Sequence, residues 1–266
     1  MPQLNTIAPK QLMRLIGTPD VPVIVDVRIA DDVALHPHVI PTALKLDHDA
    51  FDAILAATQG HPSVIICHEG HKLSHGVAAR LRSRGQKAEV LEGGAVAWAG
   101  ADYPAIPLAK SQTSARWVTR ARPKIDRIAC GWLIRRFINQ GAEILYVPRA
   151  EVIGVAQRFD AIPFDVADVA LTHRGDLCTF DAMIADFGLS HPALERLASV
   201  VRAADTNTHD QSPEAAGLLA LSVGLSRMCR DDVTQLETAL PVYDALYRWA
   251  RDGFTETHET DLGGQA

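Results

Sequence analysis

A group of potentially reactive side chains occupies residues 65–76, IICHEGHKLSHG, where one cysteine, three histidines and a lysine directly follow an apolar run. Three alternative roles are possible for Cys67 in this setting. As a thiolate it would be a nucleophile, with Lys72 adding positive charge nearby. As a metal ligand it would act with His71 and His75, a set that lacks the fourth ligand of a closed zinc site. As a core thiol it would simply continue the apolar run.

The elements expected around Cys67 would place it where α/β proteins bind ligands. VPVIVDVR (21–28) and the VII run before Cys67 are typical of strands buried on both faces of a parallel sheet, and LSHGVAARLRSRG (73–85) has helical periodicity. Cys67 then lies at the carboxyl end of a strand, beside the crevice of an open sheet. Backbone N–H groups of residues 67–72 and the following helix N-terminus would stabilise an anion. Gly70 would let this loop curl, so Cys67 is a candidate thiolate.

Three stretches resemble the signature motifs of a rhodanese (sulfurtransferase) domain in order and spacing: VDVR (25–28), CHEGHK (67–72) and LEGGAVAWAGADYP (91–104). The resemblance covers residues 4 to 107 and implies that Cys67 carries a persulfide sulfur from a small sulfane-sulfur donor to a thiol or protein acceptor. It implies no cofactor for this reaction. Related phosphatase domains have a loop one residue longer, so the resemblance favours sulfur over phosphate. It also implies a structural role for Asp26 and Arg28 and substrate binding by His68, Glu69, Gly70, His71 and Lys72.

The second half of the chain predicts a mixed, mostly helical α+β domain. A short strand at Trp117, a helix beginning near Pro123 and a strand at AEILYVP (142–148) open it. VALTHRGDLCTFD (169–181) is typical of two short strands around an Arg-Gly-Asp turn. Three further helices are predicted from apolar periodicity, at 193–205, 213–229 and 233–252.

Polar residues in this apolar half form a candidate metal site. Asp126 lies on a predicted helix among isoleucines, His173 and Asp181 flank Cys178, and Asp205 ends a helix. Histidine and carboxylate ligands would suit a divalent zinc, iron or manganese ion. The alternative is structural: the aspartates would be helix caps or ion-pair partners, and His173 would bond a strand carbonyl. The arginines available for such pairs are Arg122, Arg127 and Arg202.

A run of cationic residues opens the same domain, at Arg120, Arg122, Lys124 and Arg127. Such a run is usually a solvated face. Arginines also bind oxyanions through bidentate contacts, so chromate or another oxyanion is an alternative partner.

Five stretches resemble the chromate-resistance domain of the ChrB type, over residues 115–252: WVTRARPKIDRIACGWLIRRFI, AEILYVP, IPFDV, HRGDLCTFDAMI and PEAAGLLALSVGLSR. The resemblance implies a bacterial protein associated with resistance to chromate or to oxidative stress. Because some relatives are regarded as regulators, a second hypothesis is an oxyanion- or metal-responsive sensor in which the rhodanese fold is only a binding module.

Composition and charge limit the remaining classes. The chain has 266 residues, 47% of them hydrophobic and 22% charged, which allows a large core and two domains. A net charge of -6 makes nucleic acid an unlikely partner. Four scattered cysteines without a C-x-x-C pair favour a reducing cytoplasm, and no apolar run is long enough for a membrane span. We therefore expect an α/β rhodanese-like domain at 1–107, a linker at 108–115, a mostly helical α+β domain at 116–253 and a polar tail at 254–266.

Overall fold

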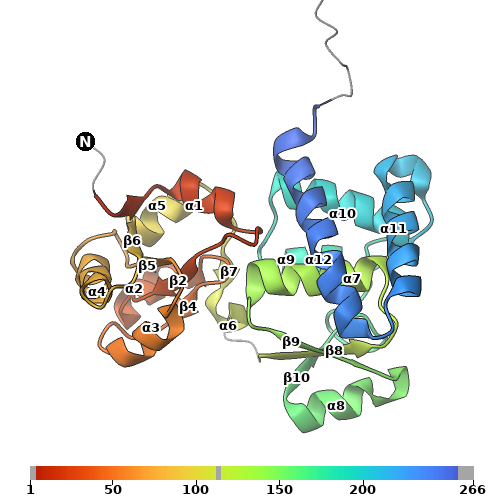
Figure 1. The fold of residues 1–266 in the computed structure, drawn as a ribbon, viewed down its shortest axis with the longest axis horizontal. Helices are drawn as coiled ribbons and strands as arrows, with labels where there is room; N and C mark the ends of the chain where they lie inside the picture. The colour runs from red at the N-terminus through yellow and green to blue at the C-terminus, as the bar shows by residue number, and fades with distance from the viewer. Residues whose placement is uncertain (1–3, 112–114, 257–266) are drawn as a thin grey trace, which may run out of the picture.

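The computed structural model describes residues 4–111 and 115–256, which form two lobes in contact (Figure 1). We call residues 4–111 the N-terminal lobe and residues 115–256 the C-terminal lobe. Residues 112–114 of the predicted linker and 257–266 of the predicted tail lie outside the described residues, and residues 108–111 of that linker form a short helix.

A five-stranded sheet, with the order β1-β6-β5-β2-β4, forms the centre of the N-terminal lobe. All neighbouring strands are parallel, as the continuous apolar runs predict. Alternate residues of β5 and its continuation face opposite sides of the sheet. Ile65 and Cys67 pack with α3 (Phe51–Thr58) and α4 (Lys72–Ser83). Val64 and Ile66 join the core under α1 (Pro9–Leu15) and α5 (Gly94–Gly100). The strands are β1 (Thr6–Ile7), β2 (Val23–Asp26), β4 (Leu44–Lys45), β5 (Ser63–Ile66) and β6 (Ala88–Leu91).

Helices cover both faces of this sheet, so its strands are buried on both sides. A small antiparallel ladder joins β3 to β7 at the edge that faces the C-terminal lobe. The helices are α1 (Pro9–Leu15), α2 (Ala30–Leu35), α3 (Phe51–Thr58), α4 (Lys72–Ser83), α5 (Gly94–Gly100) and α6 (Leu108–Ser111), and the ladder strands are β3 (His38–Val39) and β7 (Ile106–Pro107).

The C-terminal lobe packs a layer of helices against a small parallel sheet of order β10-β8-β9. Helix α8 covers the opposite face of this sheet (Figure 1). The sheet comprises β8 (Arg116–Arg120), β9 (Glu143–Val147) and β10 (Ala161–Pro163). The helical elements are α7 (Ile125–Leu133), η1 (Ile134–Ile138), η2 (Arg149–Glu151), α8 (Val152–Phe159), α9 (Thr179–Asp186), α10 (Pro192–Asp205), η3 (His209–Gln211), α11 (Glu214–Met228), α12 (Asp232–Arg248) and η4 (Trp249–Gly253).

Helix α7 is the centre of this lobe, because all nine of its residues are buried. Trp132 on α7 packs in a group of aromatic rings from η1, α9 and α12. Asp126 and Arg127 are therefore charged groups inside a core, and each needs a partner there.

The sequence-based prediction of two strands in residues 169–181 is wrong. The structure has two isolated bridges there, Leu171 with Phe164 and Arg174 with Leu177, and α9 begins at Thr179. Residues from Thr179 onward form a helix because the first N–H groups of α9 bond to the Asp126 carboxylate. The local sequence pattern cannot indicate this contact with a distant residue. The three C-terminal helices predicted from periodicity are confirmed.

The two lobes share contacts that leave no room for larger side chains. The Thr42 N–H donates to the Phe137 carbonyl at 2.9 Å, and a Cβ on Gly17 would lie 2.5 Å from the Phe137 ring. A Cβ on Gly188 would lie 2.8 Å from the Ala105 carbonyl. Across the described residues, no helix is both long and apolar enough to cross a lipid bilayer.

Candidate functional site

The Cys67 loop connects the carboxyl end of β5 to α4, as its position in the sequence predicts. The Cys67 side chain is only 5% exposed, and its Sγ accepts a hydrogen bond from the His71 N–H at 3.2 Å. The same Sγ lies 3.0 Å from the Ser74 hydroxyl, in the first turn of α4. Both groups can donate to a sulfur anion, and the helix N-terminus adds positive potential.

Ser74 is a site residue that motif reading missed. Its hydroxyl donates to the His71 carbonyl at 3.0 Å, so in this arrangement the thiol is the donor in the Cys67–Ser74 contact. If Cys67 loses its proton, rotation of the Ser74 hydroxyl lets it donate to the sulfur instead. Helical spacing from the loop places residue 74 one turn inside α4, which is the signal that identifies it.

Glycine is required at two positions that hold the loop's shape. Gly70 has φ +74°, and a Cβ there would lie 2.6 Å from the Leu91 carbonyl. Gly94 has φ +58°, and a Cβ there would lie 2.4 Å from the Cys67 carbonyl. The Ala95 N–H donates to that carbonyl at 3.0 Å, so the start of α5 supports the loop directly.

The other predicted residues of this site differ in exposure. Glu69, His71 and Lys72 are exposed at the loop surface, whereas His68 is partly buried and stacks near the His36 ring. Asp26 and Arg28 form a buried bidentate ion pair, with Nη2 to Oδ2 at 2.6 Å. Arg28 also donates to the His36 and His38 carbonyls, so the pair holds the segment that follows β2.

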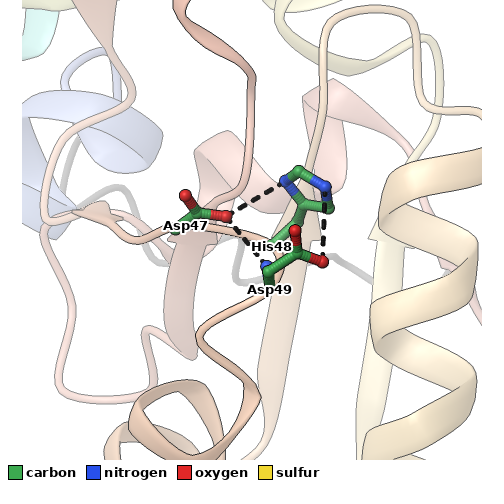
Figure 2. Close-up of side chains that lie close together, drawn as sticks. All are labelled: Asp47, His48 and Asp49. Carbon is green, nitrogen blue, oxygen red and sulfur yellow. Dashed lines mark hydrogen bonds and ion pairs between the residues drawn. The ribbon is translucent and has the colours of Figure 1, made fainter.

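Metal binding by Cys67 has no geometric support. Within the described ranges, the ligand atoms of Cys67, His71 and His75 do not converge. A second potential group, Asp47, His48 and Asp49, lies at the surface before α3 (Figure 2). These three residues are consecutive, and the Asp49 N–H bonds to the Asp47 carboxylate at 2.9 Å, so a local turn explains their proximity.

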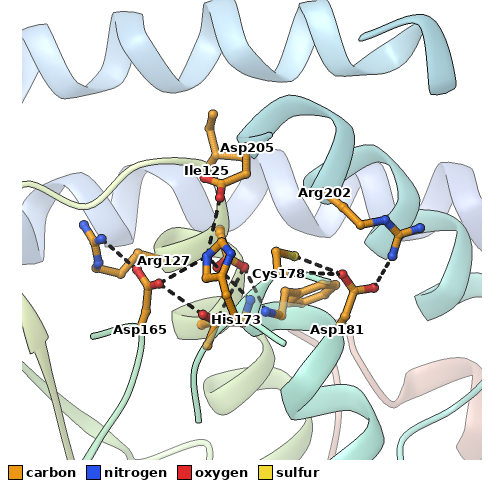
Figure 3. A network of polar contacts seen from close by, with 12 residues as sticks. Ile125, Arg127, Asp165, His173, Cys178, Asp181, Arg202 and Asp205 are labelled. Carbon is orange, nitrogen blue, oxygen red and sulfur yellow. Dashed lines mark hydrogen bonds and ion pairs between the residues drawn. The ribbon is translucent and has the colours of Figure 1, made fainter. Parts of the chain in front are cut away.

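A polar cluster in the C-terminal lobe brings together residues from four segments (Figure 3). His173 lies between the other members, with its Nε2 at 3.3 Å from Asp126, 3.6 Å from Asp165 and 3.7 Å from Asp205, measured to the nearest carboxylate oxygens. We call these four residues the His173 cluster.

Asp126 is the buried base of the His173 cluster, at 2% exposure. Its two oxygens accept the N–H groups of Thr179 and Phe180 at 3.0 and 2.8 Å, so it caps α9. Burial by itself raises the pKa of Asp126, but the hydrogen bonds from His173 and Phe180 outweigh it and leave the pKa below its ordinary value.

Asp205 and Asp181, two of the predicted metal ligands, lie in different environments. Asp205 belongs to the His173 cluster, where burial and the Asp126 charge raise its pKa to about 6. Asp181 lies outside it, because its carboxylate pairs with Arg202 at 2.6 Å and accepts the Cys178 N–H. Asp165, which was not among the predicted ligands, belongs to the His173 cluster in its place. The one feature of the sequence that points to Asp165 is its position just after β10, in the stretch IPFDV.

His173 should stabilise the metal-free fold only at low pH. Its hydrogen bond with Asp126 raises the pKa of His173 above the ordinary 6.5, although partial burial opposes this. The stabilisation is therefore fully present below pH 6.5 and is lost as the pH rises through the raised value. Because His173 is 42% exposed, we expect His173→Gln to cost about 0.5–1 kcal/mol at about pH 6 and less at about pH 9. Urea unfolding in EDTA measures this difference, and an equal cost at both pH values would contradict it.

The predicted oxyanion residues do not share one surface. Arg127 is buried and pairs with Asp165 at 2.7 Å, whereas Arg120, Arg122 and Lys124 are exposed. The Arg122 N–H bonds to Asp232 on α12. The solvated-face alternative accounts for the three exposed cations.

Comparison with known proteins identifies a family for each lobe. Residues 117–250 match the family described as the C-terminal domain of ChrB, and residues 8–101 match the rhodanese-like domain. Protein ChrB of Cupriavidus metallidurans is 33% identical over 133 residues, which are 50% of this chain and 40% of that protein. The chain thus spans about two fifths of the length of this curated relative.

Two solved structures are similar to the N-terminal lobe. A rhodanese-like domain protein from Staphylococcus aureus is 29% identical, with a TM-score of 0.31 over 36% of this chain and 91% of that one. The protein SSP1007 from Staphylococcus saprophyticus is 25% identical, with a TM-score of 0.32 over 36% of this chain and 93% of that one.

Proposed function

Because the chain belongs to the ChrB family through residues 117–250 and carries a rhodanese-like domain at residues 8–101, we propose that it is a chromate-resistance-associated sulfurtransferase whose Cys67 carries a persulfide. One observation carries this proposal: the Cys67 Sγ lies within reach of the His71 N–H and the Ser74 hydroxyl at the N-terminus of α4. The donor is a small sulfane-sulfur compound and the acceptor is a thiol.

The proposed reaction has two steps at Cys67. The thiolate attacks the outer sulfur of thiosulfate, the sulfur–sulfur bond of the donor breaks, and sulfite leaves with the electron pair. The negative charge then resides on the outer sulfur of the persulfide, where the loop donors stabilise it. An acceptor thiolate or cyanide attacks that outer sulfur, and the Cys67 thiolate is released.

Turnover with two donors tests this function against the sensor alternative. The full chain should catalyse cyanolysis of at least one of two donors, thiosulfate or 3-mercaptopyruvate, at a rate above that measured without protein. A chain that binds chromate or a divalent metal but shows no turnover with either donor would instead be a sensor whose rhodanese fold only binds.

Lys72 should act mainly on the binding of an anionic donor. It is exposed at the edge of the loop, so its charge attracts thiosulfate without contacting the Sγ. We expect Lys72→Met to raise KM for thiosulfate about threefold to tenfold at low salt, with less change in kcat. Lys87→Met, at an exposed lysine before β6, is the matched control. Unaltered KM and salt dependence in Lys72→Met would contradict this role.

We also propose that the His173 cluster binds a divalent metal ion. Of the three contacts of His173 Nε2, the one with Asp126, at 3.3 Å, is a long hydrogen bond, and those with Asp165 and Asp205, at 3.6 and 3.7 Å, are too long to be hydrogen bonds. Tetrahedral nitrogen and oxygen ligands about 2.0–2.2 Å from a metal are about 3.3–3.6 Å apart, so the spacing suits coordination. Asp126, His173 and Asp205 offer three ligand atoms within reach of one ion, whereas the Asp165 carboxylate is engaged by Arg127 and Thr179. A bound cation would offset the repulsion among these carboxylates.

Metal content and thermal stability test this second site. Protein purified without chelator should contain zinc, iron or manganese, and EDTA should lower its Tm because the metal binds only the native state. A free metal concentration a hundred times Kd would contribute about 2.7 kcal/mol. His173→Ala should lose both the metal and the EDTA response, whereas His61→Ala, at an exposed histidine of the other lobe, should keep them. If the purified protein is metal-free and its Tm does not respond to added metals, the His173 cluster does not bind metal and only caps α9.

A further inference from the structure

A cavity of about 540 Å³ lies between the two lobes, and neither candidate site contributes a residue to it. It is bounded by the outer edge of β4, by α3, by the end of η1 and by residues 139–141. Small-molecule sites have volumes of about 300–1,000 Å³ and are frequent at domain interfaces. The size and place of this cavity therefore suit a small organic ligand.

The lining of this interlobe cavity combines apolar side chains with polar groups that can donate hydrogen bonds. Leu44, Ala57 and Ile138 are among its apolar lining residues, with Ala57 from α3 and Ile138 from η1. Lys45 is the one charged side chain in the lining that the described residues provide. A ligand in this cavity would meet a single positive charge, apolar side chains and several uncharged polar groups.

Lys45 is a cation without a carboxylate partner in the described structure. Its Nζ donates to the carbonyls of Asp26 and Leu46 at 3.3 Å each, which leaves one of its three N–H groups unused. The nearby Asp26 carboxylate is already held by Arg28. Burial lowers the pKa of Lys45, and the Asp26 charge opposes this only in part. The charges of Asp26 and Asp47 act on Lys45 without a direct ion pair, so its free N–H group is available to an anion in the cavity.

Four uncharged polar side chains also line the cavity, Thr42 and Ser111 from the N-terminal lobe and Asn139 and Gln140 from the C-terminal lobe. Thr42 is 7% exposed, and its hydroxyl has no hydrogen-bond partner within the described part of the chain. Asn139 uses its Oδ1 to accept the Gly141 N–H at 3.0 Å, so its amide N–H groups can donate to a ligand. A ligand here would contact both lobes, next to the Thr42–Phe137 hydrogen bond that joins them.

We propose that this interlobe cavity binds a small organic carboxylate with an apolar body. The carboxylate pairs with Lys45, and the apolar body lies against Leu44, Ala57 and Ile138. An organic cation would be repelled by Lys45, and a neutral apolar molecule would leave the lysine without a counter-charge. This site is separate from Cys67 and does not depend on sulfur transfer.

Calorimetric titration of the full chain with octanoate and with benzoate tests the proposal. At least one of them should bind at one equivalent, and octylamine should not bind. Lys45→Met should weaken binding about tenfold or more, the range of a lost charge-assisted hydrogen bond. Ala57→Trp should fill the cavity and abolish binding, whereas Ala56→Trp, at an exposed position of the same helix, should bind as the wild type does.

The controls separate this site from the proposed sulfur chemistry. Cys67→Ser should bind the carboxylate as tightly as the wild type. Lys87→Met should also be unaffected, because Lys87 does not line the cavity. If Lys45→Met does not fold, Ala57→Trp and its Ala56→Trp control decide the outcome. The proposal is overturned if neither carboxylate binds, if octylamine binds equally well, or if binding survives Ala57→Trp.

Discussion

The Cys67→Ser variant is expected to lose sulfur transfer altogether, with cyanolysis falling by about 10³ or more to the rate without protein. A serine hydroxyl is not ionised near neutral pH and cannot form a persulfide. The fold should remain, because serine is smaller than cysteine and its hydroxyl can bond to Ser74 and the His71 carbonyl. Initial rates with thiosulfate and cyanide, together with the urea midpoint, measure both effects.

Cys229→Ser is the matched control for that variant. Cys229 is a half-buried thiol at the end of α11, far along the chain from the loop. It should retain wild-type turnover. Substantial turnover in Cys67→Ser would contradict a role for Cys67 in the reaction, and an equal loss in Cys229→Ser would show that the effect is not specific to Cys67.

Gly94→Ala should give the second large effect, through the shape of the loop. The added Cβ would lie 2.4 Å from the Cys67 carbonyl and 2.5 Å from the Gly70 nitrogen. Both are backbone atoms, so the loop must move to admit it. We expect a loss of about 2–4 kcal/mol in the free energy of unfolding and a large loss of turnover.

Gly85 offers a control with the same backbone strain and no clash. Its φ is +79°, but a Cβ there would meet nothing within 4 Å. Gly85→Ala should therefore cost only about 1 kcal/mol and leave turnover unchanged. Equal stability and activity in the two alanine variants would show that the Gly94 contact does not shape the site.

The N-terminal lobe was largely predictable because its signals are local. Buried strands appear as continuous apolar runs, and the Cys67 loop follows one of them directly. Ser74 escaped motif reading because its role depends on how the first turn of α4 faces the sulfur. The fold class of both lobes agrees with the prediction.

The C-terminal cluster could be predicted only in part, because its members meet through tertiary structure. Asp181 lies close to His173 in sequence, but the start of α9 turns its carboxylate toward Arg202. Asp165 is distant from Asp126 in sequence, and the parallel pairing of β10 with β8 brings the segment that carries it to α7. No local periodicity encodes either arrangement.

The mass of the intact protein after exposure to thiosulfate tests the central claim most directly. The account predicts an increase equal to one sulfur atom, located on the peptide that contains Cys67 and removed by cyanide or dithiothreitol. Cys130 and Cys178, both buried, should not be modified. An unchanged mass, or added sulfur on any cysteine other than Cys67, would contradict the account.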